Sequence, residues 1–241
     1  MNTLRLIRYL SPLDLVSVRR DPLLRWLVLV PLLFAIAARG LLPQLLEGAA
    51  GLLPFDILAD YDVLMGCALL LLTPMMIGMI AGFLMLDLRD DGVLAALRIT
   101  PPTLSGYLTY RLALPTLLGF SLTLIAFPIA GLPSGGATAL VITAAAASLQ
   151  GPLYALLLAT FAANKVQGFA LSKALGILML APLVSRYIPE IWQPLLAISP
   201  FYWPAQLYWA LSEGGNYLGW LIGAFAYPLL IIGLLARRLR P

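Results

Sequence analysis

Side chains able to do chemistry are scarce in this sequence of 241 residues. It holds no histidine and one cysteine, Cys67. A disulfide within the chain, a histidine-based catalytic site and a zinc site of cysteine and histidine are therefore excluded. Neither lysine follows a glycine, which excludes the Gly-x-x-x-x-Gly-Lys-Ser/Thr loop that cradles nucleotide phosphates. If the protein uses ATP, a separate chain must bind it.

Charged side chains gather most densely in residues 87–98. The run contains Asp87, Arg89, Asp90, Asp91, Gly92, Leu94, Leu97 and Arg98, and Thr100 and Pro101 follow it. Acidic residues at its start and arginine at its end favour a short helix through the helix dipole, and Pro101 would end that helix. Because Leu94 and Leu97 share one face, the helix is suited to docking in a groove of a partner protein.

The elements that carry this run are strongly apolar. Hydrophobic residues make up 61% of the chain and charged residues 11%, against about 25% charged in soluble domains. Six apolar segments approach or exceed the roughly 20 residues of a membrane span. They are residues 23–42, 63–86, 107–130, 139–162, 169–185 and 217–236. We predict an all-α membrane protein with six transmembrane helices in a single domain, 1–241. It comprises an interfacial arm (1–22), the spans (23–236) and a basic tail (237–241).

The basic residues predict the orientation of these spans. Thirteen of the fifteen would lie on one side of the membrane: Arg5, Arg8, Arg19, Arg20, Arg25, Arg89, Arg98, Arg111, Lys165, Lys173, Arg237, Arg238 and Arg240. Only Arg39 and Arg186 would lie on the other side. Basic residues concentrate on the cytoplasmic side of membrane proteins, so we predict that both termini are cytoplasmic. The net charge of +4 then reflects this asymmetry of the loops; the lipid bilayer is the expected partner, and no nucleic-acid partner is expected.

Two segments outside the spans are amphipathic. In the arm, apolar and basic residues alternate at helical spacing, so we predict an interfacial helix that Pro12 interrupts or restarts. Asp21 should cap the next helix, with Pro22 in its first turn. Four of the five tryptophans lie within 192–220. Because Trp and Tyr favour membrane interfaces, we predict an aromatic re-entrant segment of short helices before the last span, acting as an anchor.

The span interiors carry small and mildly polar residues. Gly78 and Gly82 form a GxxxG pattern, which permits close helix contact within the chain or with a second copy. Every span contains a proline. Candidate residues for a substrate path are Thr73, Ser121, Thr123, Ser148, Gln150 and Tyr154. No charged residue is expected at mid-membrane, which disfavours a carrier driven by a proton or sodium gradient.

Taken together, these motifs resemble the permease subunits of ABC-2 type exporters, and within them the drug-export type described for fluoroquinolones. The resemblance rests on the 87–108 pattern, on Arg20-Asp21-Pro22 before the first span and on Asn164-Lys165-Val166-Gln167-Gly168 before the fifth. Leu88 departs from the pattern, since an acidic residue is expected there, which puts in doubt any salt bridge that relatives make at that position.

The resemblance implies that two permeases, identical or homologous, pair with two cytoplasmic ABC ATPase subunits. ATP and Mg²⁺ would be bound by the ATPases, with no cofactor on this chain. The residues 87–101 named above, together with Arg19 and Arg20, would contact the ATPase. The exported substrate would be an amphipathic small molecule or drug.

Three alternatives come from other classes of protein. A secondary transporter or channel would work without ATP. A phospholipid-synthesis enzyme of the CDP-alcohol phosphotransferase type is favoured by Asp91-Gly92, but Leu88 and Ala96 depart from its metal-binding signature. A membrane anchor for another protein would need no dedicated cytoplasmic loop.

Overall fold

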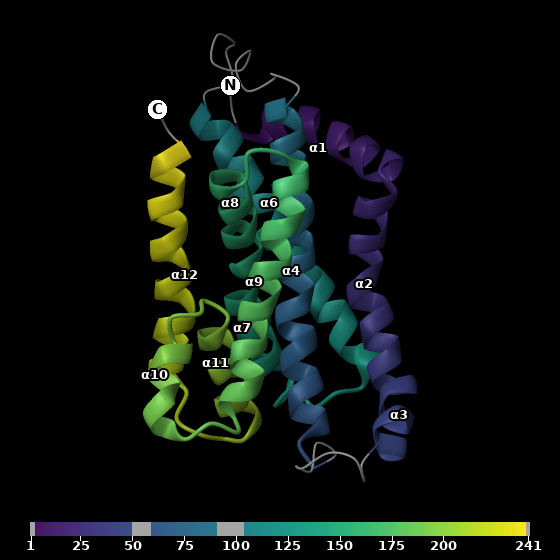
Figure 1. The fold of residues 1–241 in the computed structure, drawn as a ribbon, viewed down its shortest axis with the longest axis vertical. Coiled ribbons are helices and arrows are strands. Elements are labelled where there is room, and N and C mark those ends of the chain that lie inside the picture. Colours follow the sequence, from purple (N-terminus) through teal and green to yellow (C-terminus); the bar gives the residue numbers. More distant parts are fainter. Residues whose placement is uncertain (1–2, 50–58, 91–103, 240–241) are drawn as a thin grey trace.

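The computed structural model describes residues 3–49, 59–90 and 104–239 of the chain, and these ranges form a helical bundle (Figure 1). The helices are α1 (Thr3–Arg20), α2 (Pro22–Arg39), α3 (Leu41–Ala49), α4 (Tyr61–Asp90), α6 (Leu104–Ala130), α7 (Ala137–Ser148), α8 (Gln150–Phe161), α9 (Lys165–Ser185), the short η2 (Glu190–Trp192), α10 (Gln193–Leu196), α11 (Tyr202–Ser212) and α12 (Leu218–Leu239). No strand occurs within these ranges.

In the described ranges, six helices are long and apolar enough to cross a membrane, as predicted. They are Pro22–Arg39, Tyr61–Asp90, Gly106–Ala130, Ala137–Phe161, Lys165–Ser185 and Leu218–Arg238. The first span ends at Arg39 rather than residue 42, because α3 begins as a separate helix at Leu41. The fourth consists of α7 and α8 with a turn at Leu149. Pro152 contributes to this turn, because it has no backbone N–H to donate to the Ser148 carbonyl.

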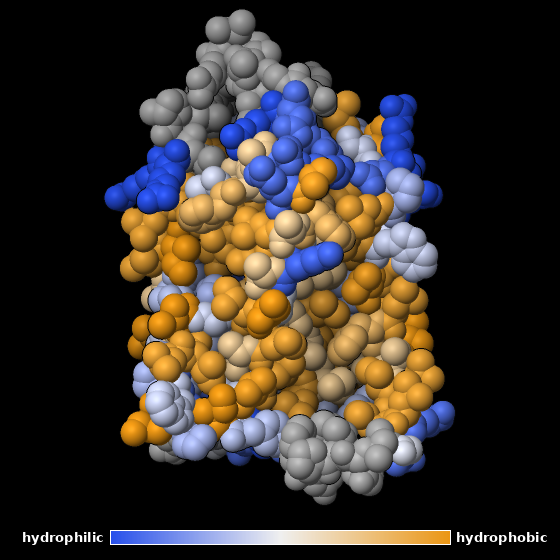
Figure 2. Space-filling model, in the orientation of Figure 1, coloured by the Kyte–Doolittle hydropathy of each residue, from blue (hydrophilic) through white to orange (hydrophobic). Residues whose placement is uncertain are grey.

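The long helices run alternately up and down, so that α1, the end of α4, the start of α9 and the end of α12 lie at one end of the bundle (Figure 1). We call this the terminal end. On the face shown in Figure 2, a broad apolar band separates this end, where hydrophilic residues gather, from the opposite end. An apolar band between polar ends is what a multi-pass membrane protein requires. That the terminal end is cytoplasmic remains a prediction.

Helix α4 forms the centre of the bundle, and small residues let α8 approach it closely. A Cβ atom on Gly78 would lie 2.9 Å from the Cα atom of Gly151, and one on Gly82 would lie 3.0 Å from the Cβ atom of Leu158. The space beside both glycines is therefore filled by α8 of the same chain. The GxxxG pattern serves the packing of α4 on α8.

Helix α1 lies across the terminal end (Figure 1). It is continuous through Pro12, so the prediction that this proline interrupts or restarts the helix was wrong. Proline removes one backbone donor. The next turn is nevertheless held in place, because Asp14 is paired with a residue of α6. At the junction with α2, Asp21 accepts hydrogen bonds from the backbone nitrogens of Leu23 and Leu24, at 2.9 and 3.4 Å, which confirms the predicted cap.

The aromatic segment before the last span forms the short helices η2, α10 and α11 at the end opposite α1. Tyr202, Tyr208 and Trp209 are buried against the bundle, whereas Trp192 is exposed. Helix α11 therefore packs as core, whereas α10 has no buried residue and stays available for the predicted anchoring role. How it sits relative to the membrane remains a prediction.

Candidate functional site

The first group of functional side chains is an ion-pair cluster around Lys165 at the terminal end. Lys165 is the first residue of α9, a helix capped by Asn164. Its Nζ atom donates to Asp21 Oδ2 at 2.7 Å and to Asp87 Oδ2 at 3.0 Å. Since Asp21 also caps α2 through Oδ1, one lysine joins the α1–α2 junction, the end of α4 and the start of α9. We call Asp21, Asp87 and Lys165 the Lys165 cluster.

This cluster is only partly shielded from solvent. The Lys165 side chain is 32% exposed, Asp21 26% and Asp87 36%. The hydrogen bond from Lys165 lowers the pKa of the Asp21 carboxyl, and the Leu23 and Leu24 backbone nitrogens add to this effect. Ion pairs that are this exposed contribute little to stability. The cluster is therefore better suited to hold three helix ends in one relative position than to stabilise the fold.

The end of α4 is fixed by two further contacts. Arg89 Nη1 donates to the carbonyl oxygen of Ala162 at the end of α8, at 3.2 Å. Leu88 packs against an apolar cluster that includes Met85, Tyr107 and Ala159, so this departure from the family pattern fills an apolar position. The salt bridge of this turn is made by Asp87 instead.

A second group, the Asp14 cluster, joins α1 to α6. Arg111 Nη1 donates to Asp14 Oδ2 at 2.8 Å, and the Tyr110 hydroxyl donates to the same oxygen at 2.7 Å. Arg111 Nε donates to the Tyr107 hydroxyl at 3.1 Å. The Arg111 guanidinium carbon lies 5.3 Å from the centre of the Tyr107 ring and 5.6 Å from that of Tyr110, which is within cation–π range. The pair is buried, with 3% of the Arg111 side chain exposed and 13% of Asp14.

The sequence analysis grouped Arg111 with the basic residues on one side of the membrane, although it falls within the predicted span 107–130. It lies inside α6 and is buried. The reason is its pairing with Asp14, which supplies the opposite charge that a buried arginine needs.

The predicted ATPase-coupling residues fall into three groups. Asp87 and Arg89 make the contacts above, while Arg19, Arg20 and Asp90 are exposed on the surface of the terminal end. Asp91, Gly92, Leu94, Leu97, Arg98, Thr100 and Pro101 lie outside the described residues.

Five of the six candidate substrate-path residues make hydrogen bonds within the protein. Thr73, Thr123 and Ser148 donate to carbonyl oxygens of their own helices. Gln150 donates to the Pro200 carbonyl, and Tyr154 donates to that of Ser172. Ser121 differs, because it lines a groove on the side of the bundle.

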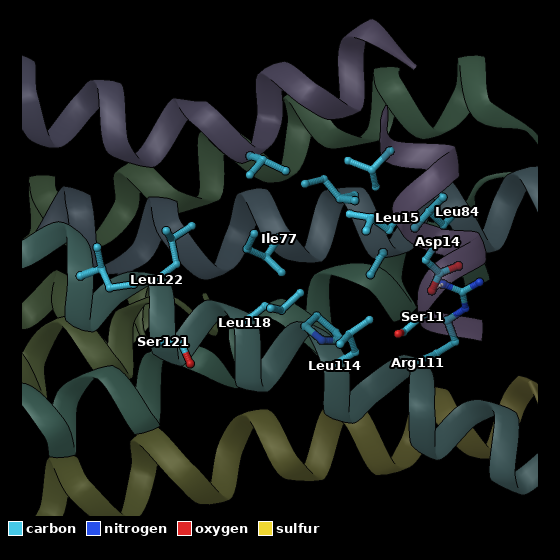
Figure 3. Close-up of a pocket in the computed structure, with 16 residues that line it drawn as sticks. Ser11, Asp14, Leu15, Ile77, Leu84, Arg111, Leu114, Leu118, Ser121 and Leu122 are labelled. Atoms are coloured by element: carbon cyan, nitrogen blue, oxygen red, sulfur yellow. Dashed lines mark hydrogen bonds and ion pairs between the residues drawn. The ribbon is translucent and has the colours of Figure 1, made fainter. Parts of the chain in front are cut away.

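This groove is bounded by α1, α2, α4 and α6 and encloses about 500 Å³ (Figure 3). Most of its lining is apolar, from residues such as Ile77, Leu84, Leu118 and Leu122. Its polar lining consists of Ser11, Asp14 and Arg111 near α1 and Ser121 at the far end. A groove of this kind is able to hold a drug-sized amphipathic molecule.

Sequence reasoning missed the partners that assemble these clusters. Asp21 and Lys165 lie in stretches quoted for the family resemblance, but their pairing across 144 residues has no local signal. Asp14 had one available signal, because it is the only acidic residue in the basic and apolar helix α1.

Comparisons with known proteins relate the whole chain to a family of permeases. A family model described as "Fluoroquinolones export permease protein Rv2686c-like" matches residues 14–236. The fluoroquinolones export permease proteins Rv2686c and MT2760, from two strains of Mycobacterium tuberculosis, are each 32% identical to this chain. Each alignment covers 94% of this chain and 91% of the relative. No solved structure matches the chain.

Proposed function

Because this chain belongs to the family of Rv2686c-like fluoroquinolones export permeases, we propose that it is the membrane-spanning subunit of an ATP-driven ABC exporter. In this proposal it moves an amphipathic small molecule, such as a fluoroquinolone, out of the cytoplasm. A separate ATPase binds ATP and Mg²⁺. A second permease, identical or homologous, completes the translocation path.

The observation that carries this proposal is the Lys165 cluster. It joins the α1–α2 junction, the end of α4 and the start of α9, and the stretches quoted for the ABC-2 resemblance contain all three of its residues. Movement of one of these helix ends therefore acts on the other two. Exposed Arg19, Arg20 and Asp90 lie close by in the sequence, where a cytoplasmic ATPase would contact them.

A secondary transporter is the main rival. Within the described residues, no acidic side chain lies in the middle of a span, and the charged residues of the spans lie toward helix ends except for Lys173, the ninth of the 21 residues of α9. Ion-coupled carriers usually place ionisable or unwound ion sites near the bilayer midplane. This distribution therefore supports an external energy source such as ATP.

The first test is affinity purification of the tagged full chain from its native membranes, followed by reconstitution and transport of the fluorescent fluoroquinolone norfloxacin. The proposal predicts a stoichiometric partner of P-loop ATPase sequence and norfloxacin export that requires ATP. Purification of the chain alone in several detergents, with export driven by a proton gradient, would overturn the proposal.

A charge reversal tests the coupling surface. We expect Asp90→Lys to insert normally and to lower ATP-driven export at least fivefold, a change of about 1 kcal/mol, because it removes an acidic residue from the proposed contact. The matched control is Glu47→Lys, another exposed acidic residue, on α3 at the opposite end. Equal export by the two variants would refute the role of this surface.

A further inference from the structure

We propose that the groove between α1, α2, α4 and α6 is the binding site through which the exported amphiphile enters the protein. The apolar part of the ligand would lie along α4 and α6, its charged group beside the Asp14 cluster, and a second polar group at Ser121. This inference rests on the proposed function and adds to it a location and a ligand class.

The Ser121 hydroxyl is unusual because it lacks the hydrogen bond that most serines and threonines of these helices make. Serine and threonine in membrane helices commonly bond to a carbonyl three or four residues earlier, and Thr116 and Thr123 of the same helix do so, both at 2.8 Å. The Ser121 hydroxyl makes no such bond and has no partner among the described residues. It lies in the groove lining (Figure 3), so it is available to a ligand.

The Arg111 guanidinium has hydrogen-bond donors that its partners in the protein do not use. A guanidinium has five N–H donors. Within the described residues Nε is bonded to Tyr107 and Nη1 to Asp14, while Nη2 has no hydrogen-bond partner. Figure 3 shows this head group at the α1 side of the groove, close to Ser11. Because Asp14 already balances the charge of Arg111, the pair presents a dipole. Such a dipole suits a zwitterionic or carboxylate-bearing ligand better than a cation.

The size and polarity of the groove fit a drug-sized molecule better than a lipid acyl chain. The volume of about 500 Å³ falls within the range of small-molecule sites, which are mostly apolar with a few placed polar groups. A lipid acyl chain would fill the apolar part but would leave the Ser121 hydroxyl unpaired. A ligand with polar groups at both ends and a flat apolar body satisfies both ends of the groove.

The walls of the groove also connect it to the proposed coupling surface. Helix α1 contributes Ser11 and Asp14 to the lining and ends beside Asp21 of the Lys165 cluster. Because the Asp14–Arg111 pair fixes α1 to α6, a displacement of α1 by the ATPase would carry α6 with it and change the groove against α2 and α4.

The test is binding of norfloxacin to the full chain in lipid nanodiscs, measured by fluorescence anisotropy. Ser121→Phe should weaken binding at least tenfold by filling the groove. Ser121→Ala, which cannot clash, should weaken it by a smaller factor through loss of the hydroxyl. Ala113→Phe is the matched control, since it adds the same ring at an exposed position of α6 outside the groove, and should leave affinity unchanged.

Equal affinity in Ser121→Phe and Ala113→Phe would overturn the inference. Loss of a co-purified phospholipid from Ser121→Phe, with norfloxacin affinity retained, would also overturn it by making the groove a lipid site. Failure of the proposed function is distinguishable, because it would appear as wild-type complex that binds norfloxacin but does not export it with ATP.

Discussion

The two ends of the bundle each hold an arginine that stacks on aromatic rings and joins distant segments, but they bury it to different extents. At the terminal end, Arg111 is 3% exposed and pairs with Asp14 across 97 residues. At the opposite end, Arg186 is 27% exposed, donates to Asp60 and Glu213 at 3.1 and 2.8 Å, and lies over Trp209. Helix α1 is thus fixed to the spans by an ion pair shielded from solvent, whereas the ion pairs at the opposite end are partly exposed.

This contrast in burial indicates where a movement can be transmitted. A buried ion pair is costly to break on one side only, so α1 follows α6 as one body. The Lys165 cluster and the Arg186 cluster (Asp60, Arg186, Tyr187 and Glu213) are more exposed and easier to rearrange. The terminal end therefore combines the rigid attachment of α1 to α6 with the Lys165 cluster, whose ion pairs can rearrange. This combination suits the proposed coupling to an ATPase.

Breaking the buried pair should reduce stability more than any other change considered. Arg111→Leu leaves the Asp14 carboxylate buried without its partner, and we expect a loss of about 3–5 kcal/mol in the free energy of unfolding. Arg186→Leu at the more exposed end should lower the free energy of unfolding by about 1 kcal/mol or less. Thermal or denaturant unfolding of the two variants in matched detergent measures the contrast.

A double variant is the control for this comparison. In Asp14→Leu with Arg111→Leu no charge is left unpaired, so much of the lost stability should return. Similar losses in Arg111→Leu and Arg186→Leu would show that the two ends do not differ energetically.

The next effect separates coupling from stability. Lys165→Ala and Arg186→Ala should each cost about 1 kcal/mol or less in stability, because both lysine and arginine are partly exposed. Only Lys165→Ala should lower ATP-driven export, by about fivefold, while Lys165→Arg should retain most of it. The measurement compares ATP-driven export by the variants in proteoliposomes that contain the partner ATPase. Equal losses of export in both alanine variants would contradict a special role for the Lys165 cluster.

The smallest effect is a pH dependence of the same cluster. Lys165 lowers the pKa of Asp21 below its usual 3.8 in the folded protein. The resulting stabilisation is fully present above pH 3.8 and is lost as the pH falls through the lowered pKa. The stability difference between wild type and Lys165→Ala should therefore shrink in acid below pH 3.8. A difference in unfolding temperature that stays constant from pH 6 to pH 3 would contradict this ion pair.

Local chemistry made part of this structure predictable from the sequence. Apolar runs of span length gave the six spans, and the capping preference of aspartate before proline gave the start of α2. The end of α7 at Ser148 was not predictable in this way, because prolines such as Pro74 and Pro115 lie inside continuous helices. The groove and the two clusters were not predictable either, since each needs residues far apart in the chain to meet. Arg111 shows this most clearly, because its sequence neighbours are those of an apolar span and only Asp14 of α1 explains why a charged side chain is buried there.

The most direct test of the coupling account is site-specific photo-crosslinking in native membranes. The photoreactive residue p-benzoylphenylalanine would replace Arg19 or Asp90 at the terminal end and, as the comparison, Tyr217 at the opposite end. All three positions are exposed. The account predicts adducts with a P-loop ATPase from positions 19 and 90 and none from 217. An ATPase adduct from position 217, or none from positions 19 and 90 in export-competent protein, would contradict it.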